Sequence, residues 1–508
     1  MIAKVTSGAT VGLEARIVTV EVDIASHGLP YFGIVGLPDK GVAESKDRVR
    51  SALRNSGAEF PIQRIIVNLA PADLPKIGPS YDLPIALGIL IASGQLEADL
   101  TDKLIFGELS LDGHLRPVNG TLSLALLAKD QGINEIFLPA GSELEASVVP
   151  GVTVYAAESL ADIFHHLAGH RLLQEIPYQN PADLFTESQV YEFDMKDVRG
   201  QEQIKRALEI AAAGGHNILL SGPPGAGKTL LARTLPSILP RLSVDEALEI
   251  TKIYSVAGLK QGQAIISERP FRSPHHTASP VGLVGGGTHP MPGEVSLAHR
   301  GVLHLDELPE FPRLVLESLR QPLEDGKITV SRAQGSVTYP AKFIMIASQN
   351  PCPCGFLGDT KRACVCHPTQ IARYTKKISG PILDRIDLHL TVASVDHDKL
   401  TADTAAETSA QIRQRVQKAR EIQQHRLKAT KFKSNAEMSS AQVKIDCKLD
   451  NESRELIRQA ATRLNLSARA FFRVLKVART IADLAGSPAI EKSHLAEALQ
   501  YRPKTDLG

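Results

Sequence analysis

The sequence predicts an α/β protein with a parallel-sheet core and a helical C-terminal region. Runs rich in β-branched and apolar residues, such as ARIVTVEVDIA and RIIVNLAP, alternate near the N-terminus with helical stretches. Farther along, the apolar run Asn217–Leu220 enters a glycine-rich turn and then a helix, which is the order expected of a strand in a parallel sheet. From about His397 the pattern is helical, and ARAFFRVLKVARTIADLAG is amphipathic.

Composition along the chain divides it into four parts. Residues 1–172 form the first α/β block, in which the helix over YDLPIALGILIASG is expected to be buried. Residues 173–192 are polar and contain prolines, which is typical of a linker. Residues 193–394 form the second α/β block, and residues 395–508 form the helical region.

The composition is that of a globular protein. Of 508 residues, 43% are hydrophobic and 22% are charged, which excludes a wholly disordered or fibrous chain. The sequence offers no apolar stretch long enough to span a bilayer, and its first residues lack the order of a secretory signal. We therefore expect a cytoplasmic protein with no membrane partner.

Charge is distributed unevenly, although the formal net charge is only +1. Residues 401–508 hold 20 Lys and Arg residues against 12 Asp and Glu residues. Within them, residues 411–433 hold eight Lys and Arg residues against one acid, Glu421. Such a segment is either a solvated helix or a surface for a polyanion such as nucleic acid.

A phosphate-binding loop is the strongest motif in the sequence. The segment GPPGAGKT has two glycines four residues apart, followed by Lys228 and Thr229, and it lies between a strand and a helix. Glycines let backbone N–H groups surround phosphate oxygens, while Lys228 reaches the outer phosphates and Thr229 binds Mg²⁺. The residues predicted to contact ATP here are Gly222, Pro223, Pro224, Gly225, Ala226, Gly227, Lys228, Thr229 and Leu230.

Polar residues also end two later strands. In GVLHLDE, an apolar strand ends in Asp306, a Mg²⁺ ligand through water, and Glu307, the general base for an attacking water. The strand in KFIMIASQN ends at Asn350, whose side chain is placed to position that water. These residues and the phosphate loop predict an ATPase that uses ATP and Mg²⁺.

Longer motifs then carry a family resemblance. The segments FRSPHHTAS, GGGTHPMPGEVSLAHRGVLHLDELPEF, ASQNPCPCG and SGPILDRIDLHL resemble the magnesium-chelatase-like group of AAA+ ATPases. The resemblance implies an AAA+ core, a helical lid and a hexameric ring. It implies that Val198, Gly200 and Gln201 contact adenine and that Asn350 is the sensor-1 residue.

Two arginines receive roles from the same resemblance. Arg385 in LDRID matches the arginine finger, which acts on ATP bound by a neighbouring subunit, and Arg469 in LSARA matches the sensor-2 arginine. Arg473 is the alternative for the second role. A planar, permanently charged guanidinium suits both roles because it stabilises charge on a transferring phosphoryl group.

The whole chain resembles the competence-associated branch of this family, and this resemblance implies a specific function. The implied function is a DNA motor, a branch-migration helicase that acts in recombination and in integration of transforming DNA. The alternative is a metal-chelatase-type motor that remodels a protein partner. An ATP-dependent protease and a non-catalytic scaffold are less favoured, because the catalytic residues of an ATPase are all present and those of a protease are not.

The N-terminal block resembles the proteolytic domain of the Lon family. LPKIGPSYDLPIALGIL places Ser80 where that family has its nucleophile, but the position of the partner lysine is taken by Leu122. Lys129 lies two helical turns farther on. Because a serine without a base is a weak nucleophile, we expect an inactive α+β domain kept for assembly or DNA contact.

Four cysteines form the remaining candidate site. Nine residues separate the pair Cys352 and Cys354 from the pair Cys364 and Cys366, in a loop rich in Gly and Pro. Four thiolates at this spacing predict a tetrahedral Zn²⁺ site, with His367 as an alternative ligand. Four free thiols are the other interpretation. Cys447 lies apart and is expected to be an ordinary, partly buried residue.

Two insertions are expected to project from the ATPase core. ERPFRSPHHTASPVGLVGGGTHPMPG is rich in Gly and Pro, and its paired His275 and His276 suit polar loop contacts better than a metal. KITVSRAQGSVTYP predicts a hairpin with its turn at Ala-Gln-Gly. The family resemblance places both in the pore of a ring, where Lys327 and Arg332 are candidates for phosphate contact.

Overall fold

The computed structural model divides the chain into two compact units. Unit 1 comprises Met1–Glu187 with Val244–Ser267, and unit 2 comprises Ser188–Ser243 with Glu268–Gly508. The structure describes residues 2–185, 191–260, 262–287, 290–332, 335–359, 361–394 and 406–503. The side chains of residues 332 and 335 lie outside this description.

Unit 1 is built on two four-stranded mixed sheets. The first has the strand order β1 (Ile2–Val11), β2 (Glu14–Ile24), β4 (Arg64–Ala70) and β3 (Tyr31–Val35). The second has the order β10 (Glu175–Ile176), β9 (Thr153–Ala157), β8 (Glu135–Pro139) and β5 (Lys103–Ile105). Alternate residues of β1, β2 and β4 are buried, since one face of the first sheet is covered by α3 (Asp82–Ala92).

Helix α3 is the predicted buried helix, and nearly all of its side chains are inaccessible to solvent. Strand β10 lies within residues 173–192 and pairs antiparallel with β9, so the first residues of the expected linker belong to a sheet. The other elements of unit 1 are α1 (Lys40–Ala43), α2 (Ser45–Asn55), η1 (Pro79–Tyr81), β6 (Glu108–Leu109), β7 (Leu115–Arg116), α4 (Thr121–Asp130), α5 (Glu143–Ala146), α6 (Leu160–Leu167), η2 (Pro181–Leu184) and α9 (Val244–Val256).

Helix α9 and the residues after it join unit 1, although chain order assigns them to the span 193–394. Helix α9 contacts α4, and the segment contributes Leu248 and Ala264 to the apolar core of unit 1. The Ser255 hydroxyl donates to Glu145, and Lys260 lies 3.7 Å from the same carboxylate. Burial lowers the pKa of Lys260 to about 8 despite this acid. The residues of this segment therefore stabilise the first unit.

Unit 2 contains a five-stranded parallel sheet. Its strand order is β12 (Phe271–Arg272), β15 (Val302–Leu305), β18 (Ile344–Gln349), β11 (Ile218–Ser221) and β19 (Leu388–Thr391). Strand β15 is buried throughout and β18 nearly so, as expected where both faces of a parallel sheet are covered. Both the α/β class and the parallel sheet are thus confirmed.

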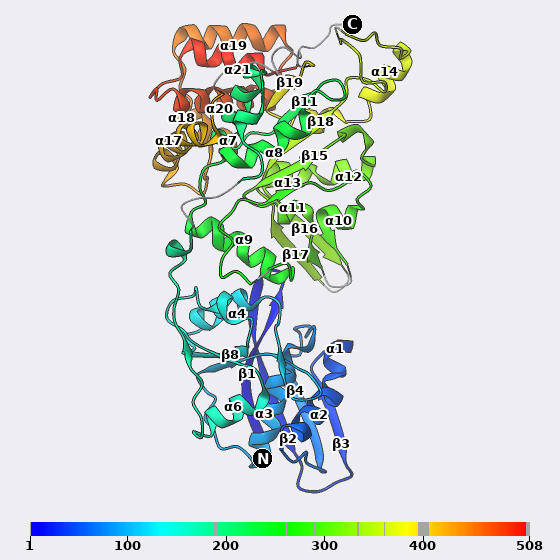
Figure 1. The fold of residues 1–508 in the computed structure, drawn as a ribbon, viewed down its shortest axis with the longest axis vertical. Coiled ribbons are helices and arrows are strands. Elements are labelled where there is room, and N and C mark those ends of the chain that lie inside the picture. The colour runs from blue at the N-terminus through cyan, green and yellow to red at the C-terminus, as the bar shows by residue number, and fades with distance from the viewer. Residues whose placement is uncertain are drawn as a thin grey trace. The chain divides into compact units, whose positions relative to one another are not determined.

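The helical C-terminal region is also confirmed, and it packs on the sheet domain of unit 2 (Figure 1). Helices α17 (Ser409–Leu427) and α20 (Ala468–Leu484) both contact α7 (Glu202–Gly214), and α17 also contacts α8 (Lys228–Ile238). The remaining helices of this region are α18 (Ser440–Asp446), α19 (Asn451–Arg463) and α21 (Lys492–Gln500). No described helix combines the length and apolar character needed to cross a lipid bilayer.

Short elements complete unit 2. They are η3 (Met195–Asp197), α10 (Pro280–Val284), β13 (Gly285–Gly286), β14 (Met291–Pro292), α11 (Glu294–Leu297), η4 (Leu308–Glu310), α12 (Arg313–Ser318), α13 (Arg320–Asp325), β16 (Lys327–Arg332), β17 (Gly335–Pro340), α14 (Pro368–Thr375), α15 (Gly380–Leu383) and η5 (Asn435–Glu437).

Candidate active site

The phosphate loop joins the carboxyl end of β11 to the first turn of α8. Gly225 and Gly227 have φ angles of 76° and 83°, in the left-handed region that glycine adopts without a Cβ clash. Gly227 is also the N-cap of α8, so the loop leads directly into the positive end of a helix dipole. This backbone is suited to holding an anion.

Lys228 and Asn350 lie together at this loop. The Lys228 ammonium donates to the carbonyl oxygens of Gly222 and Pro223, at 2.6 and 2.9 Å, and to Asn350 Oδ1 at 3.1 Å. Burial lowers the pKa of Lys228, while the charges of Asp306 and Glu307 oppose that shift. The cation is therefore held at the loop by three oxygen acceptors.

Thr229 and Asp306 meet across the same edge of the sheet. The Thr229 hydroxyl donates to Asp306 Oδ2 at 3.0 Å, and the Ser348 hydroxyl donates to the other carboxylate oxygen. Burial raises the pKa of Asp306, but the hydrogen bond from Ser348, the electrostatic effect of His304 and the hydrogen bond from Thr229 together outweigh it and leave the pKa below its ordinary value. A hydroxyl and an ionised carboxylate are oxygen ligands of the kind that Mg²⁺ prefers. These side chains therefore fit the predicted Mg²⁺ site.

Glu307 has an unusual backbone and a polar neighbour. Its φ angle of 52° is uncommon for a residue with a side chain, and its N–H donates to Asp306 Oδ1 at 3.0 Å. The half-exposed carboxylate lies 3.6 Å from His276 Nδ1. The sequence predicts only polar loop contacts for His276, because nothing in its spacing identifies Glu307 as its partner. Ser348 was likewise not identified.

The proposed adenine-contacting residues reach the phosphate loop from another direction. Gln201 is the N-cap of α7, and its side-chain amide donates to the carbonyl oxygens of Ala226 and Ala393, at 3.0 and 3.3 Å. Val198 is buried three residues before it, and Gly200 has a φ angle of 66°. The stretch 198–201 therefore lies beside the loop that holds Lys228.

Arg385 and Arg469 share one acid, Glu324. Arg469 donates to Glu324 Oε1 at 2.6 Å, and Arg385 donates to the other oxygen and to the Pro381 carbonyl. Arg385 is 6% exposed, whereas the side chain of Arg469 is 49% exposed. Glu324 is a further residue that sequence patterns did not identify.

The two arginines lie at the opposite edge of the sheet from Lys228. Asn217 immediately precedes β11, and its side chain donates to the Arg385 carbonyl at 3.2 Å. Because all five strands are parallel, their amino ends lie at one edge and the phosphate loop follows β11 at the other. The structure thus brings Arg385 and Arg469 together but does not bring them to the phosphate loop of the same chain. Arg473 instead donates to the buried Asp387.

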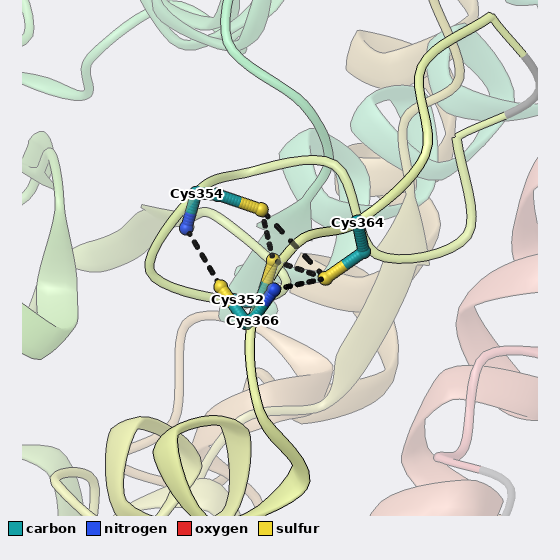
Figure 2. A group of neighbouring side chains, drawn as sticks. All are labelled: Cys352, Cys354, Cys364 and Cys366. Atoms are coloured by element: carbon teal, nitrogen blue, oxygen red, sulfur yellow. Dashed lines mark hydrogen bonds between the residues drawn. The ribbon is translucent and has the colours of Figure 1, made fainter.

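The four clustered cysteines converge on one point (Figure 2). The Cys352 sulfur lies 3.4 Å from that of Cys354, and the Cys364 sulfur lies 3.7 Å from both. With Cys366, all four sulfurs lie within 4.8 Å of one another. A tetrahedral site with Zn–S bonds of about 2.3 Å separates its sulfurs by about 3.8 Å, which these positions match closely.

The alternative ligand and the fifth cysteine have other positions. His367 is the N-cap of α14, and its backbone N–H donates to the Gln370 side chain at 2.9 Å. The candidate metal cluster in the described part of the chain consists of the four cysteines alone. Cys447 is buried at the end of α18.

Comparison with known proteins places the chain in a family. Residues 194–400 match the family described as magnesium chelatase, subunit ChlI; residues 20–142 match subunit ChlI of Mg-chelatase; and residues 406–502 match its C-terminal part. Competence protein ComM of Haemophilus influenzae is 46% identical over 508 residues, covering 99% of this chain and 97% of that protein. The chain belongs to the magnesium-chelatase-like ComM/YifB family.

Two other relatives show how far the similarity extends. The YifB protein of Escherichia coli is 46% identical over 497 residues, covering 97% of this chain and 96% of that protein. The magnesium-chelatase 38 kDa subunit of Rhodobacter capsulatus is 27% identical over 177 residues, which is 31% of this chain and 50% of that protein. ComM/YifB relatives therefore match both units, and the chelatase subunit matches a part.

The hairpin predicted from the segment KITVSRAQGSVTYP is present in unit 2. Strands β16 and β17 pair antiparallel from Lys327 opposite Pro340 to Arg332 opposite Gly335. Ile328 and Val330 are buried and Lys327 is exposed, as the alternation of a half-buried strand requires. The residues at the tip, 333–334, and the side chain of Arg332 lie outside the described residues.

The basic segment 411–433 makes many contacts within unit 2. Arg413 donates to the Ser237 carbonyl, Arg415 pairs with Glu209 and Glu407, Arg420 donates to the Ala212 and Ala213 carbonyls, and Arg426 pairs with Asp483. Half of the eight cations thus hold α17 to its neighbours. The other four are the exposed Lys418, Lys428 and Lys431 and the half-buried Lys433.

The Ser80 region of unit 1 shows no lysine at the position that the Lon family requires. Ser80 is half-buried in η1, Leu122 is fully buried in α4, and Lys129 is exposed at the end of that helix. Sequence reasoning did not identify Lys76, a buried lysine four residues before Ser80. Its ammonium donates to the Pro71 carbonyl, and burial lowers its pKa.

Proposed function

We propose that the chain is an ATPase whose site is completed by a neighbouring copy. The observation that carries this proposal is the gathering of Lys228, Thr229, Asp306, Glu307 and Asn350 around the phosphate loop. Phosphate oxygens take over the hydrogen bonds that Lys228 makes to the Gly222 and Pro223 carbonyls. When bound, Mg²⁺ neutralises charge on the outer phosphates.

The remaining residues around the phosphate loop have separate roles in ATP binding and hydrolysis. Glu307 accepts the proton of the attacking water, and Asn350 orients that water beside Lys228. Val198, Gly200 and Gln201 hold the adenine on the other side of the loop. Product release returns Lys228 to its carbonyl acceptors.

The neighbour supplies the arginines. Arg385 and Arg469 lie at the far edge of the sheet and face Glu324, so they cannot stabilise phosphate bound by their own chain without a large rearrangement. In a ring the far edge of one subunit meets the phosphate loop of the next. We propose a hexameric ring with one ATP at each junction, as the family resemblance implies.

We further propose that the ring moves DNA and migrates branches during recombination and integration of transforming DNA. Support comes from the 46% identity to a protein named for competence over 99% of this chain. The exposed hairpin residue Lys327 and the lysines of residues 418–433 offer sequence-independent phosphate contacts. A chelatase-type motor is the second candidate, because residues 194–400 match a magnesium chelatase subunit.

The deciding experiment measures ATP turnover with single-stranded, duplex and four-way-junction DNA at several salt concentrations. A DNA motor hydrolyses ATP faster with DNA, and the stimulation falls steeply as salt rises. Turnover that is unchanged by every DNA would contradict the DNA task and favour the chelatase-type motor.

We also propose that Cys352, Cys354, Cys364 and Cys366 hold one structural Zn²⁺. Their sulfur positions match a tetrahedral site, and closed four-thiolate sites bind zinc tightly. Elemental analysis of protein purified without chelators is expected to give about one zinc per chain. A content below about 0.5 would favour four free thiols.

Unit 1 is proposed to serve assembly or DNA contact without peptide cleavage, because Leu122 fills the position of the base. Incubation with an unfolded protein and ATP tests this. Peptide release that disappears in Ser80→Ala would overturn the proposal and would direct attention to Lys76 as the base.

A further inference from the structure

The loop that carries the four cysteines lies directly on the phosphate loop. This segment, residues 351–367, begins immediately after Asn350 and is called the cysteine loop below. Gly355, next to Cys354, approaches Pro224 so closely that a Cβ there would lie 2.5 Å from Pro224 Cδ and 2.8 Å from Cγ. No side chain larger than hydrogen fits between the cysteine loop and the phosphate loop at this point.

Two further contacts attach the same region to the site. Burial raises the pKa of Tyr374, in the helix α14 that follows the cysteine loop, to about 12, and the neighbouring backbone of Asn350 opposes this rise. Lys377, just after α14, donates to Glu310 at 2.9 Å, and Glu310 closes the short helix η4 that follows Glu307. The region therefore touches the phosphate loop, the sensor and the segment with the general base.

The cysteine loop has little apolar packing of its own. Leu357 is 43% exposed and Val365 is 86% exposed, whereas Cys352 is fully buried. A loop of this kind is held by its cross-link, because few apolar groups offset the entropy lost on ordering it. An ion held by the four cysteines would then be the main support of the surface that Gly355 presents to Pro224.

We propose that metal occupancy of the four-cysteine site controls nucleotide binding at the phosphate loop. With the metal bound, the cysteine loop holds Pro224 and Asn350 in the arrangement that accepts the outer phosphates. Without it, four thiols within 4.8 Å no longer share a ligand, the loop loosens, and the phosphate loop loses its contact with Gly355. This inference rests on the ATP site proposed above and adds a regulatory ligand to it.

The first test compares the affinity of the full chain for a fluorescent ATP analogue before and after zinc is removed by a high-affinity chelator. Affinity is expected to fall about tenfold, equivalent to about 1.4 kcal/mol, and to recover when zinc is restored. Cys354→Ser is expected to reproduce the loss, and the buried Cys447→Ser to keep both zinc and affinity. Equal affinity with and without zinc would overturn the proposal.

The second test separates the contact from the metal. Gly355→Ala places a Cβ against Pro224, while Gly358→Ala in the same loop carries similar backbone strain (φ of 79° against 85°) and meets nothing within 4 Å. Gly355→Ala is expected to keep one zinc per chain and bind the analogue about tenfold more weakly. Gly358→Ala is expected to bind like the native chain. If Gly355→Ala and Gly358→Ala bound the analogue equally well, the contact between Gly355 and Pro224 would not control nucleotide binding.

The outcomes distinguish this inference from the proposed function. If the native, zinc-loaded chain fails to bind the ATP analogue, the ATP site itself is wrong. If the native chain binds the analogue and contains no zinc, the metal assignment is wrong while the ATPase proposal stands.

Discussion

At the scale of single residues, Asn217 organises the amino edge of the parallel sheet. Its side chain accepts from the Met345 N–H at 2.8 Å and donates to the Arg385 carbonyl, and its own N–H donates to Asp387 at 3.0 Å. A buried amide with all of these partners fixes the starts of three strands at once. The position of Arg385 depends on this arrangement.

Asp387 is the most strongly perturbed acid at that edge. Burial alone would raise its pKa, but Arg473, His216 and the Asn217 N–H hold the pKa of this carboxyl far below its ordinary value. We expect Asp387→Asn to lower the free energy of unfolding by about 3 kcal/mol at neutral pH, because it leaves Arg473 without its buried partner. Urea titration measures the difference.

The sign of the pH dependence follows from the lowered pKa. Asp387 contributes its stability above the unfolded pKa near 4, and the contribution is lost as pH falls toward the lower folded value. The difference in the free energy of unfolding between the native protein and Asp387→Asn should therefore decrease below about pH 4. Glu452→Gln removes an exposed ion pair with Lys492 and should change stability little. If Glu452→Gln lowered the free energy of unfolding as much as Asp387→Asn, the buried position of Asp387 would not explain its effect.

Glu307→Gln tests the base. The amide keeps the size of the side chain but cannot accept a proton, so we expect ATP binding to persist while turnover falls by about 10²-fold or more. Binding of an ATP analogue and steady-state phosphate release measure the two effects. Glu317→Gln, an acid on α12 outside the site, is the control, and turnover at the native rate in Glu307→Gln would exclude Glu307 as the base.

Arg385→Ala tests the contribution of a neighbour. This variant should assemble and bind ATP yet hydrolyse it poorly, and Lys228→Ala should largely lose nucleotide binding. Mixing the two is expected to restore part of the turnover, since the intact phosphate loop of one variant can meet the intact arginine of the other. Absence of any recovery in mixed oligomers would contradict a site shared between subunits.

At the scale of elements, α9 shows that chain order does not determine packing. Its segment lies between α8 and β12 in sequence, but its apolar residues and Lys260 are buried in unit 1. Helix α17 is a second example, because four of its arginines bond to groups of unit 2. Both elements stabilise the fold with residues that local patterns would assign elsewhere.

A fragment experiment tests the role of the α9 segment. Residues 1–187 joined by a flexible linker to residues 244–267 should unfold cooperatively. Residues 1–187 alone should melt about 10 °C lower, because about 3 kcal/mol of apolar burial is lost. Equal melting temperatures by circular dichroism would show that the segment adds nothing to unit 1.

At the scale of the whole molecule, the sequence predicted the contacts that the ends of parallel strands dictate and missed contacts between side chains outside those strands. The parallel sheet, the helical region and the grouping of Lys228 with Asn350 follow from strand ends that carry polar residues, which parallel strands necessarily bring to one edge. The approach of His276 to Glu307 and the sharing of Glu324 by two arginines involve side chains that lie in loops and helices outside the strands. No periodicity or motif records such contacts.

Three chain crossings connect the two units, after residues 187, 243 and 267. A single proteolytic cut near residue 187 would give two fragments. The larger fragment would still contain α9, whose apolar side chains pack against the smaller fragment. The two fragments should therefore elute together in gel filtration and separate only in denaturant. A deletion of unit 1 therefore has to remove Val244–Ser267 from the middle of the chain as well as the N-terminal residues.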